Sequence, residues 1–133
     1  MNNSTFLCES FGNSKKEQYL CSQITAEDIM RRPQIVEQIQ QAIHQADPTA
    51  TAILYGSEAR GDARPDSDID LLILLDGEQR DFRREGEIAG KLYDIELDSG
   101  IIISPMIMLR QQWENRPFKT PFYINVMNEG IRL

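Results

Sequence analysis

Two carboxylates stand at the start of an apolar segment of the chain, in Asp68-Ile69-Asp70. Because side chains two residues apart in a β-strand point to the same face, these carboxylates would stand roughly 6 to 7 Å apart and could lean together. Mg²⁺ prefers hard oxygen ligands and is usually held by one or two carboxylates together with the phosphates of a substrate. The pair therefore predicts a Mg²⁺ site that a triphosphate would complete.

A second element, Gly56-Ser57, precedes the aspartates and could hold the phosphates. Gly56 lets the backbone approach a phosphate without a Cβ clash, and Ser57 could cap a helical turn that begins at Glu58. The hydroxyl and the backbone N–H groups of such a turn attract anions. Arg60 and Arg64 lie between the two elements. The residues alone leave open whether each arginine contacts phosphate or braces the loop, and Arg60 is the candidate nucleotide-binding residue.

Each element alone has an ordinary explanation, since Gly-Ser is common in turns and Asp-x-Asp can cap a strand or face solvent. Two other uses of paired aspartates fit poorly. An EF-hand loop from Asp66 would need Gly and Glu where the chain has Leu71 and Gly77. A phosphatase with an aspartyl nucleophile would carry the pair after its apolar strand rather than before it. Together, the two elements bring a phosphate-holding turn beside a metal-holding strand.

Residues 56–71, GSEARGDARPDSDIDL, resemble the signature of the minimal nucleotidyltransferases in the DNA polymerase β-like superfamily, and the likeness is specific over residues 53–75. The resemblance implies an α/β (α+β) nucleotidyltransferase fold, with a short mixed β-sheet flanked by helices. It puts Gly56 and Ser57 on the triphosphate and Asp68 and Asp70 on two Mg²⁺ ions, and Asp68, Asp70 and Ser57 form the implied catalytic set. The implied reaction moves a nucleoside monophosphate from a Mg²⁺-nucleoside triphosphate, expected to be ATP, to an acceptor hydroxyl and releases pyrophosphate.

The chain departs from this superfamily at the third carboxylate. Active relatives commonly carry one on a later strand beside the Asp-x-Asp strand, but the strand expected over residues 101–108 has no Asp or Glu, and Ser104 is its only hydroxyl. If residues 93–98 formed the strand instead, one of three acids on a single face could serve, namely Asp94, Glu96 or Asp98. The sequence therefore supports binding of the nucleotide better than its transfer.

Apolar periodicity predicts the elements that would position these residues. Apolar residues at three- and four-residue steps predict a helix from Pro33 that Asp47-Pro48 ends. Two short apolar runs predict buried strands over residues 51–55 and 68–75. The spacing i, i+4, i+7 favours a helix over residues 80–99 that Gly100 stops, rather than the strand alternative.

The C-terminal part is expected to add an edge strand and a short helix. Pro105 indicates that the strand over residues 101–108 lies at a sheet edge or is bulged. A helix ended by Gly130 is expected to carry three residues on one side, Phe122, Tyr123 and Val126. We expect the aromatic residues of this segment to pack into a core rather than to stack on a base.

Composition and length bound the class of protein. The 133-residue chain is 41% hydrophobic and 26% charged, which is ordinary for a globular protein, and no apolar run approaches the roughly 20 residues of a membrane span. We expect residues 1–24 to be a loose polar leader and residues 25–133 to form a single minimal nucleotidyltransferase domain. Without an apolar signal segment the expected location is the cytoplasm, and Cys8 and Cys21 are expected to be incidental thiols.

Charge and size also bear on the partners. A net charge of −7 with scattered Lys and Arg disfavours non-specific nucleic-acid binding. The chain has little room beyond a nucleotide-binding core, and no separate domain for a small substrate such as an aminoglycoside is apparent, so an acceptor would come from elsewhere. Proteins that resemble this one often work beside a helical partner of the HEPN class as two-component toxin and antitoxin systems. We therefore expect AMP transfer to a partner protein or small molecule, with neutralisation of a HEPN-type partner by contact as the alternative, and assembly into a homo-oligomer stays open.

Overall fold

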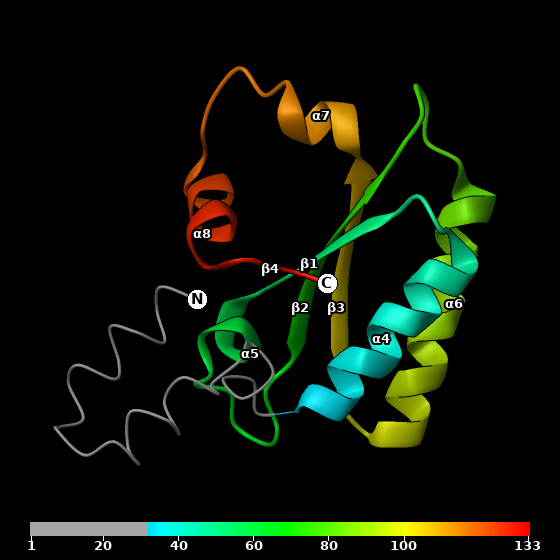
Figure 1. Ribbon diagram of the computed structural model, residues 1–133, viewed down its shortest axis with the longest axis vertical. Helices are drawn as coiled ribbons and strands as arrows, with labels where there is room; N and C mark the ends of the chain where they lie inside the picture. Colours follow the sequence, from blue (N-terminus) through cyan, green and yellow to red (C-terminus); the bar gives the residue numbers. More distant parts are fainter. Residues whose placement is uncertain (1–31) are drawn as a thin grey trace, which may run out of the picture.

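A four-stranded mixed sheet with helices on both faces forms the centre of the molecule (Figure 1). The structure, a computed structural model, describes residues 32–133, so the expected leader with its two cysteines lies outside the described residues. The elements follow one another as α4 (Pro33–Ala46), β1 (Thr51–Tyr55), α5 (Gly56–Arg60), β2 (Ile69–Leu75), α6 (Phe82–Ser99), β3 (Ile103–Leu109), α7 (Arg110–Glu114), α8 (Pro121–Glu129) and β4 (Ile131–Arg132).

The strands lie in the order β3-β2-β1-β4. β1 pairs with β2 and with β4 in antiparallel fashion, whereas β3 runs parallel to β2 after the crossover through α6. The mixed sheet predicted from the resemblance is therefore confirmed. β3 is an edge strand, as Pro105 predicted, because proline cannot donate a ladder hydrogen bond and is tolerated where one side of the strand has no partner.

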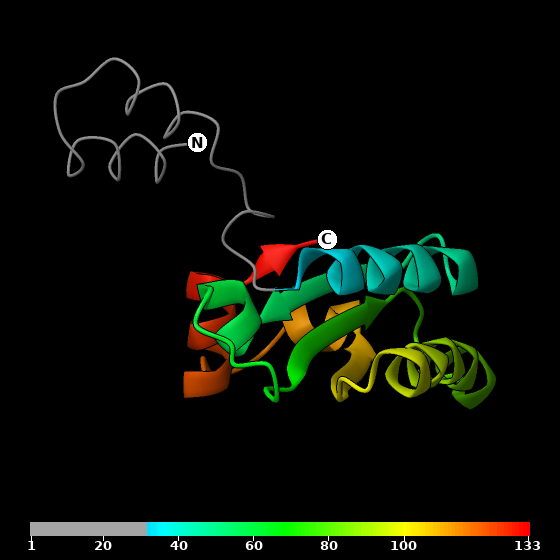
Figure 2. The same cartoon turned by 90° about the horizontal axis from the view of Figure 1, so that it is seen from below.

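Strand β2 separates two apolar clusters because successive side chains point to opposite faces. One face, with Leu71 and Ile73, packs on the buried residues of α4 and α6. The other face, with Leu72 and Leu74, packs on Trp113 of α7 and Val126 of α8. Figures 1 and 2 show α4 and α6 side by side on one side of the sheet and α8 on the other. This division determines which face the Asp-x-Asp pair can share.

Helix α6 begins and ends at sequence signals. The Asp81 carboxylate accepts hydrogen bonds from the backbone N–H groups of Arg83 and Arg84 at 3.1 and 3.2 Å, which caps the first turn. Gly100 ends the helix with φ of +73°, a left-handed conformation that favours glycine. Ile88 and Leu92 are buried at helical spacing. The helix prediction is confirmed. The alternative strand over residues 93–98 is wrong because these residues lie within α6 and pair with no strand of the sheet.

The C-terminal segment packs largely as expected. The Trp113 ring meets Phe122 edge-on with centroids 6.0 Å apart, and lies 4.8 Å from the Tyr123 centroid. The predicted helix ended by Gly130 is α8. Phe118 does not join this cluster and is 78% exposed. The two-residue strand β4 was not predicted, because a pair of residues is too short to show a period.

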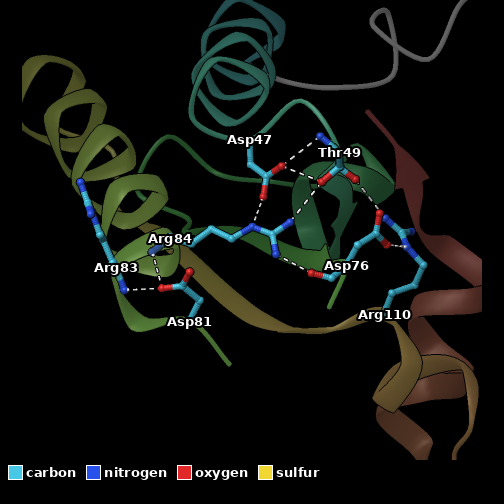
Figure 3. Close-up of polar contacts among 7 residues, drawn as sticks. All are labelled: Asp47, Thr49, Asp76, Asp81, Arg83, Arg84 and Arg110. Carbon is cyan, nitrogen blue, oxygen red and sulfur yellow. Dashed lines mark hydrogen bonds and ion pairs between the residues drawn. The ribbon is translucent and has the colours of Figure 1, made fainter. Parts of the chain in front are cut away.

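An arginine-rich network closes the end of the sheet at which β2 finishes (Figure 3). Arg84 of α6 donates to the Asp47 carboxylate, to the Asp76 carbonyl and, at 3.1 Å, to the Thr49 hydroxyl. Arg110 donates to the Asp76 carboxylate at 2.7 Å and to the Thr49 carbonyl. Burial would raise the pKa of Asp47, but the hydrogen bonds from Arg84 and Thr49 and the nearby charge of Arg84 outweigh it and lower that pKa. The network ties α4, α6 and α7 together away from the Asp-x-Asp end.

Residues 32–133 contain no helix that is both long and apolar enough to cross a membrane.

Candidate nucleotide-binding site

The Gly56 turn lies directly against the Asp70 side chain. Tyr55 is the register partner of Asp70 in the β1–β2 ladder, so Gly56 follows next to that carboxylate. Gly56 has φ of +76°, and a Cβ built on it would overlap the Asp70 Oδ2 atom. Glycine is therefore required here both by its backbone conformation and by the close approach of the carboxylate. The two elements that the sequence predicted to be neighbours are brought together.

Asp68 and Asp70 gather negative charge at the start of β2. The side chain of Asp70 points to the same sheet face as Leu72 and Leu74, the face covered by α7 and α8. Asp70 is half-buried and Asp68, just before the strand, is exposed. Burial raises the pKa of Asp70, and the charge of Asp68 raises it further. The pair is a set of hard oxygen donors whose mutual repulsion a cation would relieve.

Ser57 lies at this site but does not cap the helix. Helix α5 begins at Gly56 rather than at Glu58, with Tyr55 at its N-cap and no side-chain cap hydrogen bond. The predicted cap is therefore wrong, because the helical turn already includes Ser57. Among residues 32–133 the Ser57 hydroxyl makes no hydrogen bond. It lines an open pocket of about 440 Å³, together with Arg60, Asp62, Arg64, Asp66 and Ser67.

The two arginines of the loop differ in their partners. Arg60 donates to the Glu129 carboxylate at 3.1 and 3.2 Å and to Asp62 at 3.3 Å. These hydrogen bonds, above all those that Glu129 accepts, raise the pKa of Arg60. The Arg64 guanidinium makes no hydrogen bond or ion pair within the part of the chain that the structure describes, while its backbone N–H donates to Ser67 Oγ at 2.9 Å. The Arg60 guanidinium is held by the Glu129 and Asp62 carboxylates, whereas the Arg64 side chain lines the pocket without such a contact among the described residues.

Glu129 is a residue of this site that the sequence did not reveal. Its Oε1 atom accepts a hydrogen bond from the Gly56 backbone N–H at 3.1 Å, across a separation of 73 residues. Glu129 is the last residue of α8, and β4 then pairs with β1. No motif links it to the Gly-Ser turn, because the packing of α8 on α5 and β1 and the pairing of β4 with β1 bring it there.

No third carboxylate lies on β3. Asp70 is the register partner of Ser104, whose hydroxyl donates to Asp68 Oδ2 at 3.4 Å, a long hydrogen bond. The acids considered as substitutes are wrong, because residues 93–98 are helical and α6 packs on the opposite face of the sheet. Asp94 and Asp98 are exposed, and Glu96 accepts a hydrogen bond from the backbone N–H of Ile103 at 2.6 Å. Within residues 32–133, no group of three or more His, Cys, Asp or Glu side chains could hold a metal ion.

Comparison with known proteins connects this geometry to a family. No curated protein matches the chain in a sequence search. A family model described as polymerase beta, nucleotidyltransferase matches residues 37–115, which is more than half of the chain. The matched range runs from within α4 to just past α7 and so includes the Gly-Ser turn, the Asp-x-Asp pair and the three longest strands. The chain therefore belongs to the polymerase β nucleotidyltransferase family.

Proposed function

We propose that the chain binds a Mg²⁺-nucleoside triphosphate between the Gly56 turn and the start of β2 and transfers a nucleoside monophosphate from it. The observation that carries this proposal is the contact of the Gly56 backbone with the Asp70 carboxylate. A phosphate-binding turn and a pair of metal-binding carboxylates are useful to one another only when a single metal-bound triphosphate can touch both. Membership of the family supports the same conclusion.

Mg²⁺ fits the donor set at this end of the sheet. Asp68 and Asp70 would hold it, since both offer carboxylate oxygens and Asp70 is half-buried beside a like charge. When bound, Mg²⁺ would neutralise the charge of the phosphates and of the oxygens that react.

The side chains around the pocket would bind and orient the triphosphate. Gly56 lets the backbone lie beside the Asp70 carboxylate, and the Gly56 N–H and the Ser57 hydroxyl could donate to a phosphate bound there. Arg60 and Arg64 border the same pocket and could donate charge-assisted hydrogen bonds to phosphate oxygens. With the triphosphate held in this way, an acceptor hydroxyl would attack the α-phosphorus. A new P–O bond forms, the bond to pyrophosphate breaks, and the hydroxyl proton passes to solvent.

We propose ATP as the nucleotide and a hydroxyl of a partner protein or a small molecule as the acceptor. The pocket is open and polar, so an acceptor from another molecule can reach it. A HEPN-type helical protein is the proposed partner, which would make the chain the antitoxin of a two-component pair, and the family resemblance of residues 56–71 is the support for it.

The test uses ATP labelled on its α-phosphorus, Mg²⁺ and the HEPN-type partner. We expect label on the partner with the wild-type chain and none with Asp68→Ala/Asp70→Ala. The matched control is Asp94→Ala/Asp98→Ala, which removes the same two charges from exposed positions of α6. Labelling that survives in the Asp68/Asp70 double variant would exclude the proposed site as the place of transfer.

A second candidate function is neutralisation of the partner by contact alone. The pairing of Asp70 with Ser104, where an active relative would offer an acid, favours this candidate. Under it, Asp68→Ala/Asp70→Ala would still bind the partner and neutralise it. Loss of neutralisation with binding intact would favour transfer instead.

A further inference from the structure

The Glu129 carboxylate is bonded to two of the groups that the proposed function assigns to phosphate. Its Oε1 atom accepts from the Gly56 N–H at 3.1 Å, and its two oxygens accept from Arg60 Nη1 at 3.2 and 3.1 Å. A backbone N–H and a guanidinium that converge on one anionic oxygen are the donors that phosphate groups also use. Glu129 thus makes the contacts that a phosphate oxygen would make.

The fold holds Glu129 at this position. Gly130 follows it, and the next residue, Ile131, is the register partner of Leu54, so the chain meets the end of β1 as it leaves α8. A Cβ on Gly130 would overlap the Val126 carbonyl and lie 2.8 Å from Ile53 Cγ2, which shows how closely the backbone is packed. The Glu129 side chain is 24% exposed, and Arg60 is 47% exposed. The backbone at Glu129 is therefore fixed beside the site, whereas the Glu129 and Arg60 side chains are both partly exposed and can turn toward solvent.

The contacts of Glu129 and those of a phosphate exclude one another in part. Gly56 has one N–H, which cannot donate well to both a carboxylate and a phosphate. Glu129 also adds a third negative charge near Asp68 and Asp70, because its charge acts on Asp70. A triphosphate that approached Gly56 with Glu129 in place would meet like charge, which costs binding free energy.

We propose that Glu129 is an internal competitor of the triphosphate, a carboxylate that must leave Gly56 and Arg60 before the nucleotide can bind. The inference rests on the proposed function, since it takes Gly56 and Arg60 to be phosphate-binding groups. It makes nucleotide affinity depend on the end of α8, an element outside both sequence motifs. Breaking the Glu129 contacts costs free energy when the nucleotide binds. The apparent affinity is therefore lower than the intrinsic affinity of a site from which Glu129 is absent.

The test is calorimetric titration of Mg²⁺-ATP and of Mg²⁺-tripolyphosphate into the full chain. Glu129→Ala should bind both ligands about tenfold more tightly than the wild type, because no carboxylate has to be displaced. The affinities of Glu129→Gln should lie between those of the wild type and Glu129→Ala, since its amide oxygen can still accept from Gly56 but carries no charge. Glu114→Ala, at an exposed end of α7, is the matched control and should leave both affinities unchanged.

A double variant separates competition from bracing. If Glu129 competes for Arg60, adding Arg60→Ala to Glu129→Ala should remove most of the gain in affinity. Affinity that stays equal or falls in both Glu129 variants, with the wild type still binding, would overturn the inference and leave the nucleotide site standing. If neither the wild type nor any variant binds Mg²⁺-ATP, the proposed nucleotide site itself fails, and the inference fails with it. Because Glu129→Gln keeps the side-chain volume, it remains a test if Glu129→Ala does not fold.

Discussion

Gly56 and Asp70 meet at the end of the β1–β2 ladder, where no side chain other than hydrogen fits between the Gly56 backbone and the Asp70 carboxylate. The contact joins an element that could bind phosphate to one that could bind a divalent cation. It arises from register, because Tyr55 lies opposite Asp70 and the next residue must turn past the carboxylate.

Replacing Gly56 by alanine should damage both the fold and the proposed site. The positive φ of Gly56 and the overlap of an added Cβ with Asp70 should together cost about 1 to 3 kcal/mol of unfolding free energy. Urea unfolding measures this loss, and titration with Mg²⁺-ATP should show weakened binding in the folded fraction. The control is Gly86→Ala in α6, where nothing but the helix's own backbone lies within 4 Å of the new Cβ. The free energy of unfolding of that variant should rise by up to about 1 kcal/mol. Equal effects at the two glycines would contradict a special requirement for glycine at position 56.

Much of the fold could be predicted from apolar periodicity, since long and strongly patterned segments leave few alternatives. Residues 68–75 predicted a central strand because their tail is apolar on both faces, and both faces are covered. Residues 80–99 were ambiguous over their last turns. The helical spacing of apolar residues, the length of the segment and the stop at Gly100 made the helix the better prediction, and α6 confirms it.

The missed features depend on contacts between residues far apart in the chain. Ser57 lies inside a helical turn that starts two residues earlier than the cap pattern implied, at Gly56 rather than at Glu58. Glu129 reaches the site because α8 packs on β1 and β4 pairs with β1, and β4 is too short to leave a pattern. The bracing of Arg60 follows from the same pairing.

Replacing Asp70 by asparagine should stabilise the chain in the absence of metal. The pKa of Asp70 is raised by burial and by Asp68, so the ionised form is less favourable in the folded state than in the unfolded state. Its ionisation therefore reduces stability as pH rises above its unfolded value of about 3.9, and asparagine removes that cost at neutral pH. We expect a rise in unfolding free energy of about 0.5 to 1 kcal/mol without Mg²⁺.

The same Asp70→Asn variant should lose stabilisation by added Mg²⁺-ATP, which thermal unfolding with and without the ligand measures. Asp98→Asn, an exposed change on α6, is the control and should change neither quantity. The proposed role of Asp70 would be contradicted if Asp70→Asn is less stable than the wild type without ligand and is stabilised by Mg²⁺-ATP as much as the wild type.

Asp47 should make the fold sensitive to acid. Its pKa is lowered because hydrogen bonds from Arg84 and Thr49 outweigh its burial, so its contribution is present above its unfolded pKa and is lost as pH falls through the folded value. Asp47→Asn should cost about 1 to 3 kcal/mol near neutral pH, since it leaves Arg84 without its buried partner. Urea unfolding across a pH series should show the two proteins converging as the pH falls through the folded pKa of Asp47. A constant difference over the whole series would mean that packing, rather than charge, sets the effect.

Placing an acid at Ser104 tests whether the missing carboxylate limits the site. Ser104 is the register partner of Asp70 and its hydroxyl lies 3.4 Å from Asp68 Oδ2, so Ser104→Asp would put a third carboxylate beside the first two. Three like charges at close range should lower the free energy of unfolding without metal, by about 1 kcal/mol, and Mg²⁺ should restore it. Transfer of label from ATP to the partner should also become faster if a third oxygen ligand completes the proposed site. The control is Ser104→Asn, because asparagine has nearly the same shape as aspartate but no charge. It should show neither the loss of stability nor its reversal by Mg²⁺. If Ser104→Asp binds Mg²⁺ more tightly but transfers no label, the contact-only function would be favoured over transfer.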